Sequence, residues 1–189
     1  METAYALFKR NGYHATGIDR IIAEADVAKM TMYRNFPNKD GLIVEVLNDR
    51  AKRFEAQLDR LMEHEATPAQ KIATIFDWHE RWFQRPDFHG CLFAHALAEF
   101  SEPGHPVNQA VAAQKNGFKQ RLQYILADEL RSDQAEGAAA ALFMLIEGAT
   151  LLAQMGQGAE AIRAARLAAI AILEARSSAG PDKGQGAAQ

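Results

Sequence analysis

Apolar residues recur at three- and four-residue spacing along most of the chain, and glycine, proline and asparagine interrupt this rhythm. Such spacing is typical of amphipathic helices, and no strand-like alternation of any length occurs. The breaks predict helices over about 1–11, 17–25, 28–35, 39–64, 67–84, 90–101, 107–130, 132–155 and 159–176. The sequence therefore predicts an all-α fold of about nine helices.

The first three helices have the layout of a helix-turn-helix unit. A supporting helix is followed by two short helices that are joined by a tight turn at Asp26-Val27. Thr16 to Asp19 fits a capping box for the second helix. Val27, Met32 and Phe36 are expected to anchor the third helix inward. We expect a head over 1–45, a ligand-binding and dimerisation body over 46–176, and a disordered tail over 177–189.

The third helix and its flanks form a locally basic surface on a mildly acidic chain. The net charge is −3, yet no acid occurs from Val27 to Lys39. A helix fits the major groove, where lysine can donate to guanine and apolar side chains can contact the thymine methyl. Other polar residues suit phosphates. The candidate DNA-contacting residues are Thr16, Gly17, Lys29, Met30, Thr31, Tyr33, Arg34, Asn35 and Lys39.

Three motifs carry a family resemblance over roughly the first 45 residues. They are the glycine-aromatic pair Gly12-Tyr13, the lysine-x-threonine-x-tyrosine of Lys29 to Tyr33, and the phenylalanine-proline-x-lysine of Phe36 to Lys39. At this spacing they resemble the DNA-binding domain of tetracycline-repressor-like (TetR-type) regulators. The chain departs from the usual pattern at Asp26, Ala28 and Met30, where that family commonly has glycine, a capping serine, and glycine or proline.

The last two predicted helices, 132–155 and 159–176, are rich in alanine with interspersed leucine and isoleucine. Small residues let helix backbones approach closely, so two such pairs could build a four-helix bundle across a two-fold axis. The resemblance implies the same pairing. Because one recognition helix reads only a half-site, we expect a homodimer on a palindromic double-stranded DNA operator.

The middle helices are expected to hold a small-molecule effector, because their aromatic residues are accompanied by a few polar groups. Most aromatic residues at helical spacing belong to plain cores, so the region is better defined than its members. The candidate pocket residues are Trp78, His79, Trp82, Phe83, Cys91, Phe93, His95, Glu99, Phe118, Phe143 and Glu147.

These features predict a cytoplasmic, ligand-responsive transcriptional regulator, a repressor that its effector releases from DNA. No cofactor, metal, enzyme activity or membrane association is expected, since His89, Cys91 and His95 match no strong zinc spacing and no continuous apolar run approaches a membrane span. Two alternatives stay open. One is a helical small-molecule-binding module without DNA function, and the other is a cofactor-free enzyme or redox sensor that uses Cys91.

Overall fold

The computed structural model describes residues 1–178, and this part of the chain contains helices and no strand, as predicted. The nine α-helices of the described part agree with the expected bounds to within a few residues. The tail predicted over 177–189 lies outside the described residues, except that the backbone of 177–178 continues the last helix. The elements are α1 (Glu2–Asn11), α2 (Ile18–Glu24), α3 (Lys29–Asn35), α4 (Lys39–Met62), α5 (Pro68–Phe83), α6 (Leu92–Glu99), α7 (Pro106–Leu126), α8 (Ser132–Leu152), the π-helical turn η1 (Ala153–Gln157) and α9 (Gly158–Ser178).

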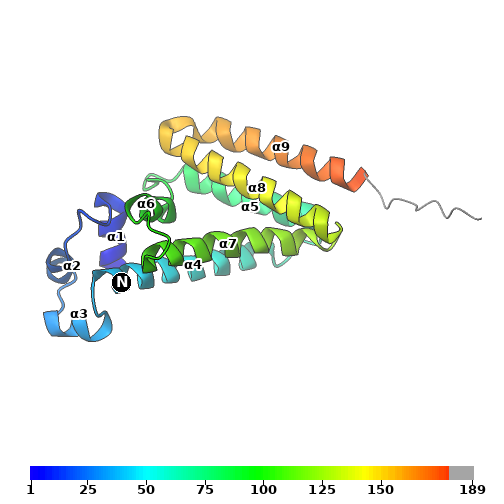
Figure 1. Cartoon of the computed structure of the whole chain (residues 1–189). Coiled ribbons are helices and arrows are strands. Elements are labelled where there is room, and N and C mark those ends of the chain that lie inside the picture. Colours follow the sequence, from blue (N-terminus) through cyan, green and yellow to red (C-terminus); the bar gives the residue numbers. More distant parts are fainter. Residues whose placement is uncertain (179–189) are drawn as a thin grey trace, which may run out of the picture.

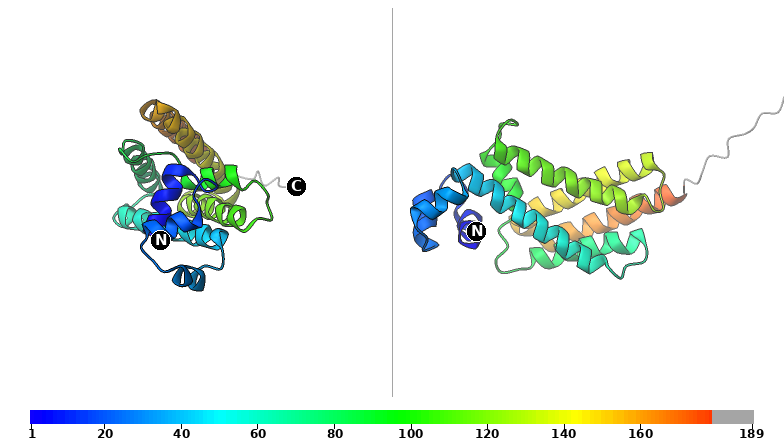
Figure 2. Two further views of the ribbon diagram at one scale, coloured as in Figure 1. Left: turned by 90° about the vertical axis from the view of Figure 1, so that its left-hand side faces the viewer. Right: turned by 90° about the horizontal axis from the view of Figure 1, so that it is seen from below.

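The molecule is elongated, with α1, α2 and α3 gathered at one end (Figures 1 and 2). Helix α4 leaves this head and runs the length of the body beside α7. Helix α8 packs on α7 and on α9, and α5 packs on α9. The body is therefore a layered helical bundle that α4 joins directly to the head.

Two hydrophobic cores share the chain, and their division does not follow the expected boundary at residue 45. The first lies in the body, between the C-terminal half of α4 and helices α5, α7, α8 and α9. The second combines the head with the start of α4, with α6 and with the first turns of α7. Its fully buried members include Leu7, Phe8, Tyr13, Ile43 and Leu47. Helix α6 thus packs with the head although it follows α5 in the chain.

Local polar contacts fix where the long helices begin. The side chain of Asn38 accepts a hydrogen bond of 2.8 Å from the Gly41 N–H at the start of α4. Thr67 and Gln70 form a reciprocal capping box at the start of α5, with Pro68 in its first turn. Both arrangements satisfy amides that have no partner inside the helix.

Two expectations for the head were wrong. Thr16 makes no capping box: Gly17 occupies the cap position of α2, and the fully buried Thr16 hydroxyl donates to the Gly12 carbonyl at 2.7 Å. That hydroxyl closes the loop after α1 instead. Val27 does not anchor α3, because it lies in the turn and is 41% exposed. Met32 is buried and Phe36 is partly buried against the same core, so these two residues hold α3.

The C-terminal stretch Ser132–Arg176 is apolar enough, by length and composition alone, to cross a membrane, with a mean hydropathy of 1.6 in its best window. In the structure it is two helices, α8 and α9, because the backbone reverses at Gly156, whose φ is +83°. The helices pack against each other, yet only 33% of that window is buried. The pair therefore presents much apolar surface outward.

His79 lies in the middle of α5 and is almost fully buried between aromatic rings. Its Nδ1 lies 2.8 Å from the Ile75 carbonyl oxygen, which only accepts, so Nδ1 carries the proton. Burial lowers the pKa of His79 from 6.5 to about 4, and the nearby Lys115 charge acts in the same direction. The imidazole is therefore neutral at pH 7.

This pKa predicts acid sensitivity of the fold. The unfolded chain binds a proton at His79 below about pH 6.5, whereas the folded chain resists it until about pH 4. Stability should therefore fall as the pH drops from 6.5 to 4, by about 3.5 kcal/mol from this group at about 1.4 kcal/mol per pH unit. Urea unfolding across this range should show a flatter profile for His79→Leu. The exposed-site control His64→Gln should keep the wild-type profile, and equal slopes for all three proteins would contradict the assignment.

Asp26 in the turn between α2 and α3 has a φ of +50°, the left-handed region that side chains other than glycine adopt at a cost. Aspartate tolerates this conformation better than most residues. Asp26→Gly should remove the strain and raise the free energy of unfolding by about 1 kcal/mol, whereas Asp26→Ala should lower it by a similar amount. Urea unfolding at one fixed protein concentration measures both, and a glycine variant no more stable than the alanine variant would refute the prediction.

Candidate DNA-contacting surface and effector pocket

Helix α3 presents one face to solvent and buries the other through Met32. Met30 is 80% exposed and Tyr33 is 40% exposed, which leaves apolar surface in water between the exposed basic residues Lys29 and Arg34. No side chain caps the first turn of α3, where Ala28 stands. The amides of Thr31 and Met32 donate to the Ala28 carbonyl, which leaves those of Lys29 and Met30 for an outside acceptor.

Two polar residues of α3, Lys29 and Asn35, form side-chain contacts within the head. The Lys29 ammonium lies 3.0 Å from an Asp19 carboxylate oxygen of α2, and the pair is largely exposed. Asn35 donates from its amide to the Thr31 carbonyl at 2.8 Å. Because an exposed ion pair contributes little, Lys29 can leave Asp19 at small cost.

The remaining candidate DNA contacts lie on either side of α3. Gly17 is exposed at the start of α2. Lys39, at the start of α4, donates to the His14 carbonyl at 3.3 Å and so bridges to the loop before α2. Thr16 is buried with its hydroxyl bonded to Gly12, so it does not reach the surface.

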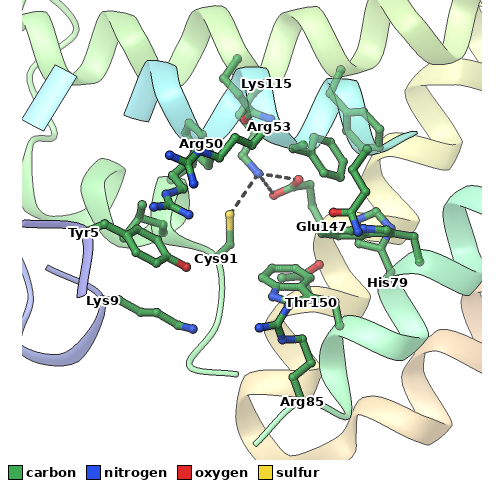
Figure 3. Close-up of a pocket in the computed structure, with 18 of the residues that line it drawn as sticks. Tyr5, Lys9, Arg50, Arg53, His79, Arg85, Cys91, Lys115, Glu147 and Thr150 are labelled. Atoms are coloured by element: carbon green, nitrogen blue, oxygen red, sulfur yellow. Dashed lines mark hydrogen bonds and ion pairs between the residues drawn. The ribbon is translucent and has the colours of Figure 1, made fainter. Parts of the chain in front are cut away.

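A cavity of about 310 Å³ opens between the head and the body. Its inner wall is aromatic, and its outer part is ringed by cationic side chains from α1, α4 and the loop after α5 (Figure 3). The lining residues are Tyr5, Lys9, Arg50, Arg53, Phe54, Gln57, Trp78, His79, Trp82, Arg85, Asp87, Cys91, Leu92, Phe93, Gln114, Lys115, Phe118, Glu147 and Thr150.

A half-buried ion pair lies in the wall of this cavity. The Lys115 ammonium of α7 contacts both Glu147 carboxylate oxygens of α8, at 2.6 and 2.8 Å, and the Cys91 sulfur at 3.5 Å (Figure 3). Burial disfavours the charged amine, but the interactions of the amine with Cys91 and with the Glu147 carboxylate outweigh that effect and raise the pKa of Lys115. The aromatic wall is therefore apolar apart from the ion pair between Lys115 and Glu147, whose charges cancel.

Seven of the eleven candidate pocket residues line this cavity, and four do not. Phe83 packs against His79, Trp82 and Phe88 on the other side of α5, and Phe143 lies in the body core against Phe118. The His95 ring contacts the Gln154 amide at 2.6 Å. None of these three lines the cavity, because each helix turns it toward a neighbouring helix.

Glu99 was expected in the pocket and instead fastens the head. Its carboxylate accepts hydrogen bonds from the backbone N–H groups of Tyr13 at 2.8 Å and His14 at 2.6 Å. Burial works against the charge, but these bonds, with the His14 ring, leave the pKa of Glu99 below its ordinary value. The acid in an otherwise apolar helix correctly indicated a specific polar contact, but its partner is the loop after α1 and not a ligand.

The cationic ring was not foreseen. Arg50, Phe54 and Gln57 recur on α4 at spacings of four and three residues, which places them on one face, so that pattern was a usable signal. No sequence pattern indicated that Tyr5 and Lys9 of α1 would line the cavity, because their position depends on how the head packs against the body.

Cys91 lines the cavity while His95 faces Gln154, so these two residues are not brought together around one point. Within residues 1–178, no group of three or more histidine, cysteine, aspartate or glutamate side chains is placed to hold a metal ion. The nearest polar neighbour of the buried thiol is Lys115 rather than a histidine base.

Known proteins match both parts of the chain. The family model described as bacterial regulatory proteins, tetR family, matches residues 1–46, and the tetracyclin repressor-like C-terminal domain matches residues 68–169. The crystal structure of SCO4454, a TetR-family transcriptional regulator from Streptomyces coelicolor, is 30% identical with a TM-score of 0.86 and covers 93% of both chains.

Curated relatives of this chain are also named as transcriptional regulators. The HTH-type transcriptional regulator LmrA of Bacillus subtilis is 27% identical over 80% of this chain and 82% of its own length. The uncharacterised HTH-type transcriptional regulator YxaF of the same organism is 34% identical, but that match spans only 38% of each chain. Since the two family models cover most of the sequence and the fold matches a solved member along nearly its whole length, the chain belongs to the tetR family of bacterial regulatory proteins.

Proposed function

We propose that this protein is a cytoplasmic, homodimeric repressor that binds a palindromic DNA operator and leaves it when a small molecule occupies the cavity. The observation that carries the proposal is the outward face of α3, where the exposed Met30 and Tyr33 lie among Lys29 and Arg34 while Met32 anchors the helix. An apolar pair within a basic surface matches the major groove, which offers thymine methyl groups beside phosphates and guanine edges. Family membership supports the same function.

The roles on this face divide by position. We assign Lys29 and Met30 to base edges because they lie at the start of α3, the part that enters the groove, and Tyr33 because it is exposed one helical turn later on the same face. Thr31, Arg34, Asn35 and Lys39 are assigned to phosphates, together with the exposed backbone at Gly17. The buried Thr16 hydroxyl is left as a structural contact.

The dimer is proposed to form through α8 and α9. Both helices expose large apolar side chains, although each also packs against the rest of the body. An apolar surface of this kind is costly in water and is typical of an interface between subunits. The exposed side chains of α8, α9 and the turn η1 between them are Met144, Leu151, Leu152, Met155, Leu167 and Ile170. A two-fold pairing of these helices would give the two α3 helices the symmetry of a palindrome.

The cavity supports the ligand-responsive part of the proposal. It lies between head and body and is lined by α1 as well as by α4, α5, α7 and α8. An occupant that favours another position of α1 would shift the population of head orientations. An enzyme using Cys91 finds less support, since its thiol is buried beside Lys115 and Glu147 without a neighbouring histidine base.

DNA binding predicts different effects for the two kinds of contact. Lys39→Ala should weaken binding to specific and random DNA alike and reduce the slope of log affinity against log salt by about one. Lys29→Ala should mainly reduce the preference for the operator over random DNA. Gel shifts with the promoter region beside the protein's own gene, at several salt concentrations, measure both. Lys52→Ala, an exposed change on α4 away from α3, should change neither. Absence of a specific shift at any salt would refute the regulator proposal.

The dimer proposal predicts that Leu151→Glu combined with Leu167→Glu gives a monomer, because two buried carboxylates per subunit would face the partner's apolar side chains. Light scattering after gel filtration measures the mass. Leu97→Glu is a matched control, since Leu97 is 45% exposed but lies on α6. A double variant that keeps the dimeric mass would place the interface elsewhere, and a wild-type protein that is monomeric at micromolar concentration would refute the dimer.

A further inference from the structure

We propose that the effector is an organic anion with an apolar body, and that its charged end competes with Asp87 and Glu2 for the cations that tie α1 to the body. The inference rests on the proposed ligand response, to which it adds the chemical class of the effector and the contacts that it breaks.

The charge of the cavity is the first support. Five cationic side chains line it, namely Lys9, Arg50, Arg53, Arg85 and Lys115, against the two acids Asp87 and Glu147. The chain as a whole has a net charge of −3, so this excess is local. Lys115 is neutralised by Glu147. The other four cations face three carboxylates, Asp87 and the neighbouring Glu2 and Asp49, so a net positive charge remains along this side of the cavity, where an anionic group would be attracted.

The apolar interior is the second support. Phe54, Trp78, Trp82, Phe93 and Phe118 line the inner part. Two polar atoms of lining residues are buried without a hydrogen-bond partner among the described residues, the Nε of Arg50 and the Oε1 of Gln114. An Asp49 carboxylate oxygen lies 3.8 Å from that Nε, beyond hydrogen-bond distance. Buried donors without partners are uncommon, so the Arg50 Nε has capacity for an anionic acceptor.

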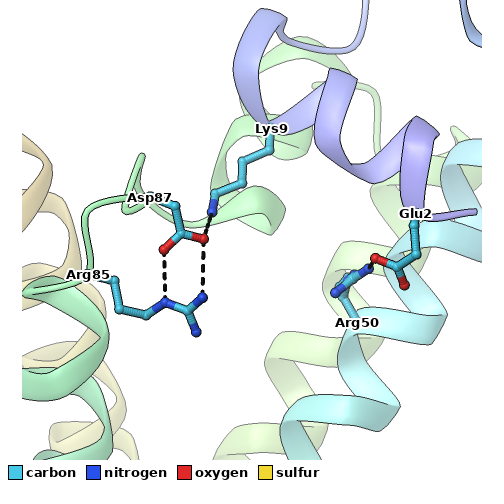
Figure 4. Close-up of polar contacts among 5 residues, drawn as sticks. All are labelled: Glu2, Lys9, Arg50, Arg85 and Asp87. Carbon is cyan, nitrogen blue, oxygen red and sulfur yellow. Dashed lines mark hydrogen bonds and ion pairs between the residues drawn. The ribbon is translucent and has the colours of Figure 1, made fainter. Parts of the chain in front are cut away.

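The contacts between α1 and the body are the third support (Figure 4). Lys9 of α1 contacts Asp87 at 2.9 Å, and Asp87 is also held by Arg85 at 2.8 and 3.2 Å. Glu2 of α1 contacts Arg50 at 2.5 Å and Arg53 at 2.7 Å. The Arg50 guanidinium also lies 3.5 Å from the centre of the Tyr5 ring. The same cations therefore both line the cavity and hold α1.

Competition follows from this double use. A carboxylate, sulfonate or phosphate that accepts from Arg50 and Lys9 occupies hydrogen-bond positions that Glu2 and Asp87 use in the empty protein. Each acid that is displaced removes one tie between α1 and the body. The coupling is reciprocal, so removing either acid should raise the affinity for the anion. A neutral ligand would fill the aromatic part and leave the ties in place.

The test uses two fluorescent probes that share one ring system. The anion 8-anilinonaphthalene-1-sulfonate and the neutral N-phenyl-1-naphthylamine are titrated into the full-length dimer without DNA. Arg50→Gln and Lys9→Gln should weaken binding of the anion about fivefold or more and affect the neutral probe much less. Arg131→Gln, which removes an exposed arginine paired with Asp133 at the far end of the body, is the matched control and should change neither.

Two further variants are expected to bind the anion more tightly, a result that misfolding would not produce. Asp87→Asn and Glu2→Gln should each tighten binding of the anion, by about fivefold for a coupling of typical size, whereas the control Asp133→Asn should not. Hydrogen exchange of residues 2–11 supplies a second measurement. The sulfonate probe should speed exchange in α1, the neutral probe should not, and Asp87→Asn should mimic the sulfonate.

The outcomes separate this inference from the proposed function. Equal affinity for both probes, or an anion affinity that none of the four cavity variants changes, would overturn the inference even if the promoter is bound. Anion binding that responds as stated, in a protein that shifts no promoter DNA, would keep the anion site and refute the repressor proposal instead.

Discussion

One carboxylate in α6 sets the position of the DNA-binding head. Glu99 accepts hydrogen bonds from the Tyr13 and His14 amides, and the loop can present both amides only because Gly12 has a φ of +82°. A Cβ at Gly12 would lie 3.0 Å from a Glu99 oxygen and crowd that carboxylate, and the left-handed backbone conformation also favours glycine there. The Tyr13 hydroxyl donates to the Leu92 carbonyl at the other end of α6, at 3.0 Å. The head is thus fastened along the whole of α6.

This attachment explains why the second core crosses from head to body. Helix α6 is eight residues long, which is about 12 Å. Its N-terminal end, with Cys91, Leu92 and Phe93, lines the cavity, and its C-terminal end holds the loop before α2. A short rigid helix with one end at the cavity and the other at the head is suited to pass a displacement between them. The family pattern of glycine and aromatic at Gly12-Tyr13 therefore belongs to this joint as much as to the head itself.

The helical fold could be predicted from sequence because each helix has apolar residues at helical spacing and is bounded by residues that start or end helices. Asn38, Pro68 and Gly156 are examples of such boundary residues. Local sequence patterns gave the wrong role for a side chain whose hydrogen-bond partner lies elsewhere in the fold. Thr16 looks like a cap, yet packing buries its hydroxyl against the end of α1. Glu99 looks like a pocket acid, yet its partner is a loop more than eighty residues earlier. The cavity's aromatic wall followed from α5, whereas Tyr5 and Lys9 enter it only because α6 docks the head against α4.

Placement of the cavity at the joint has a consequence for how regulation can work. A cavity wholly inside the body would require a chain of side-chain shifts to reach α3. Here α1 supplies Tyr5 and Lys9 to the wall, so an occupant contacts the head directly. Because Lys9 and Arg50 cannot fully serve both an occupant and their present acids, the filled and empty states differ in the ties on α1. By reciprocity, an operator that fixes the position of the head must also alter how tightly the cavity is filled.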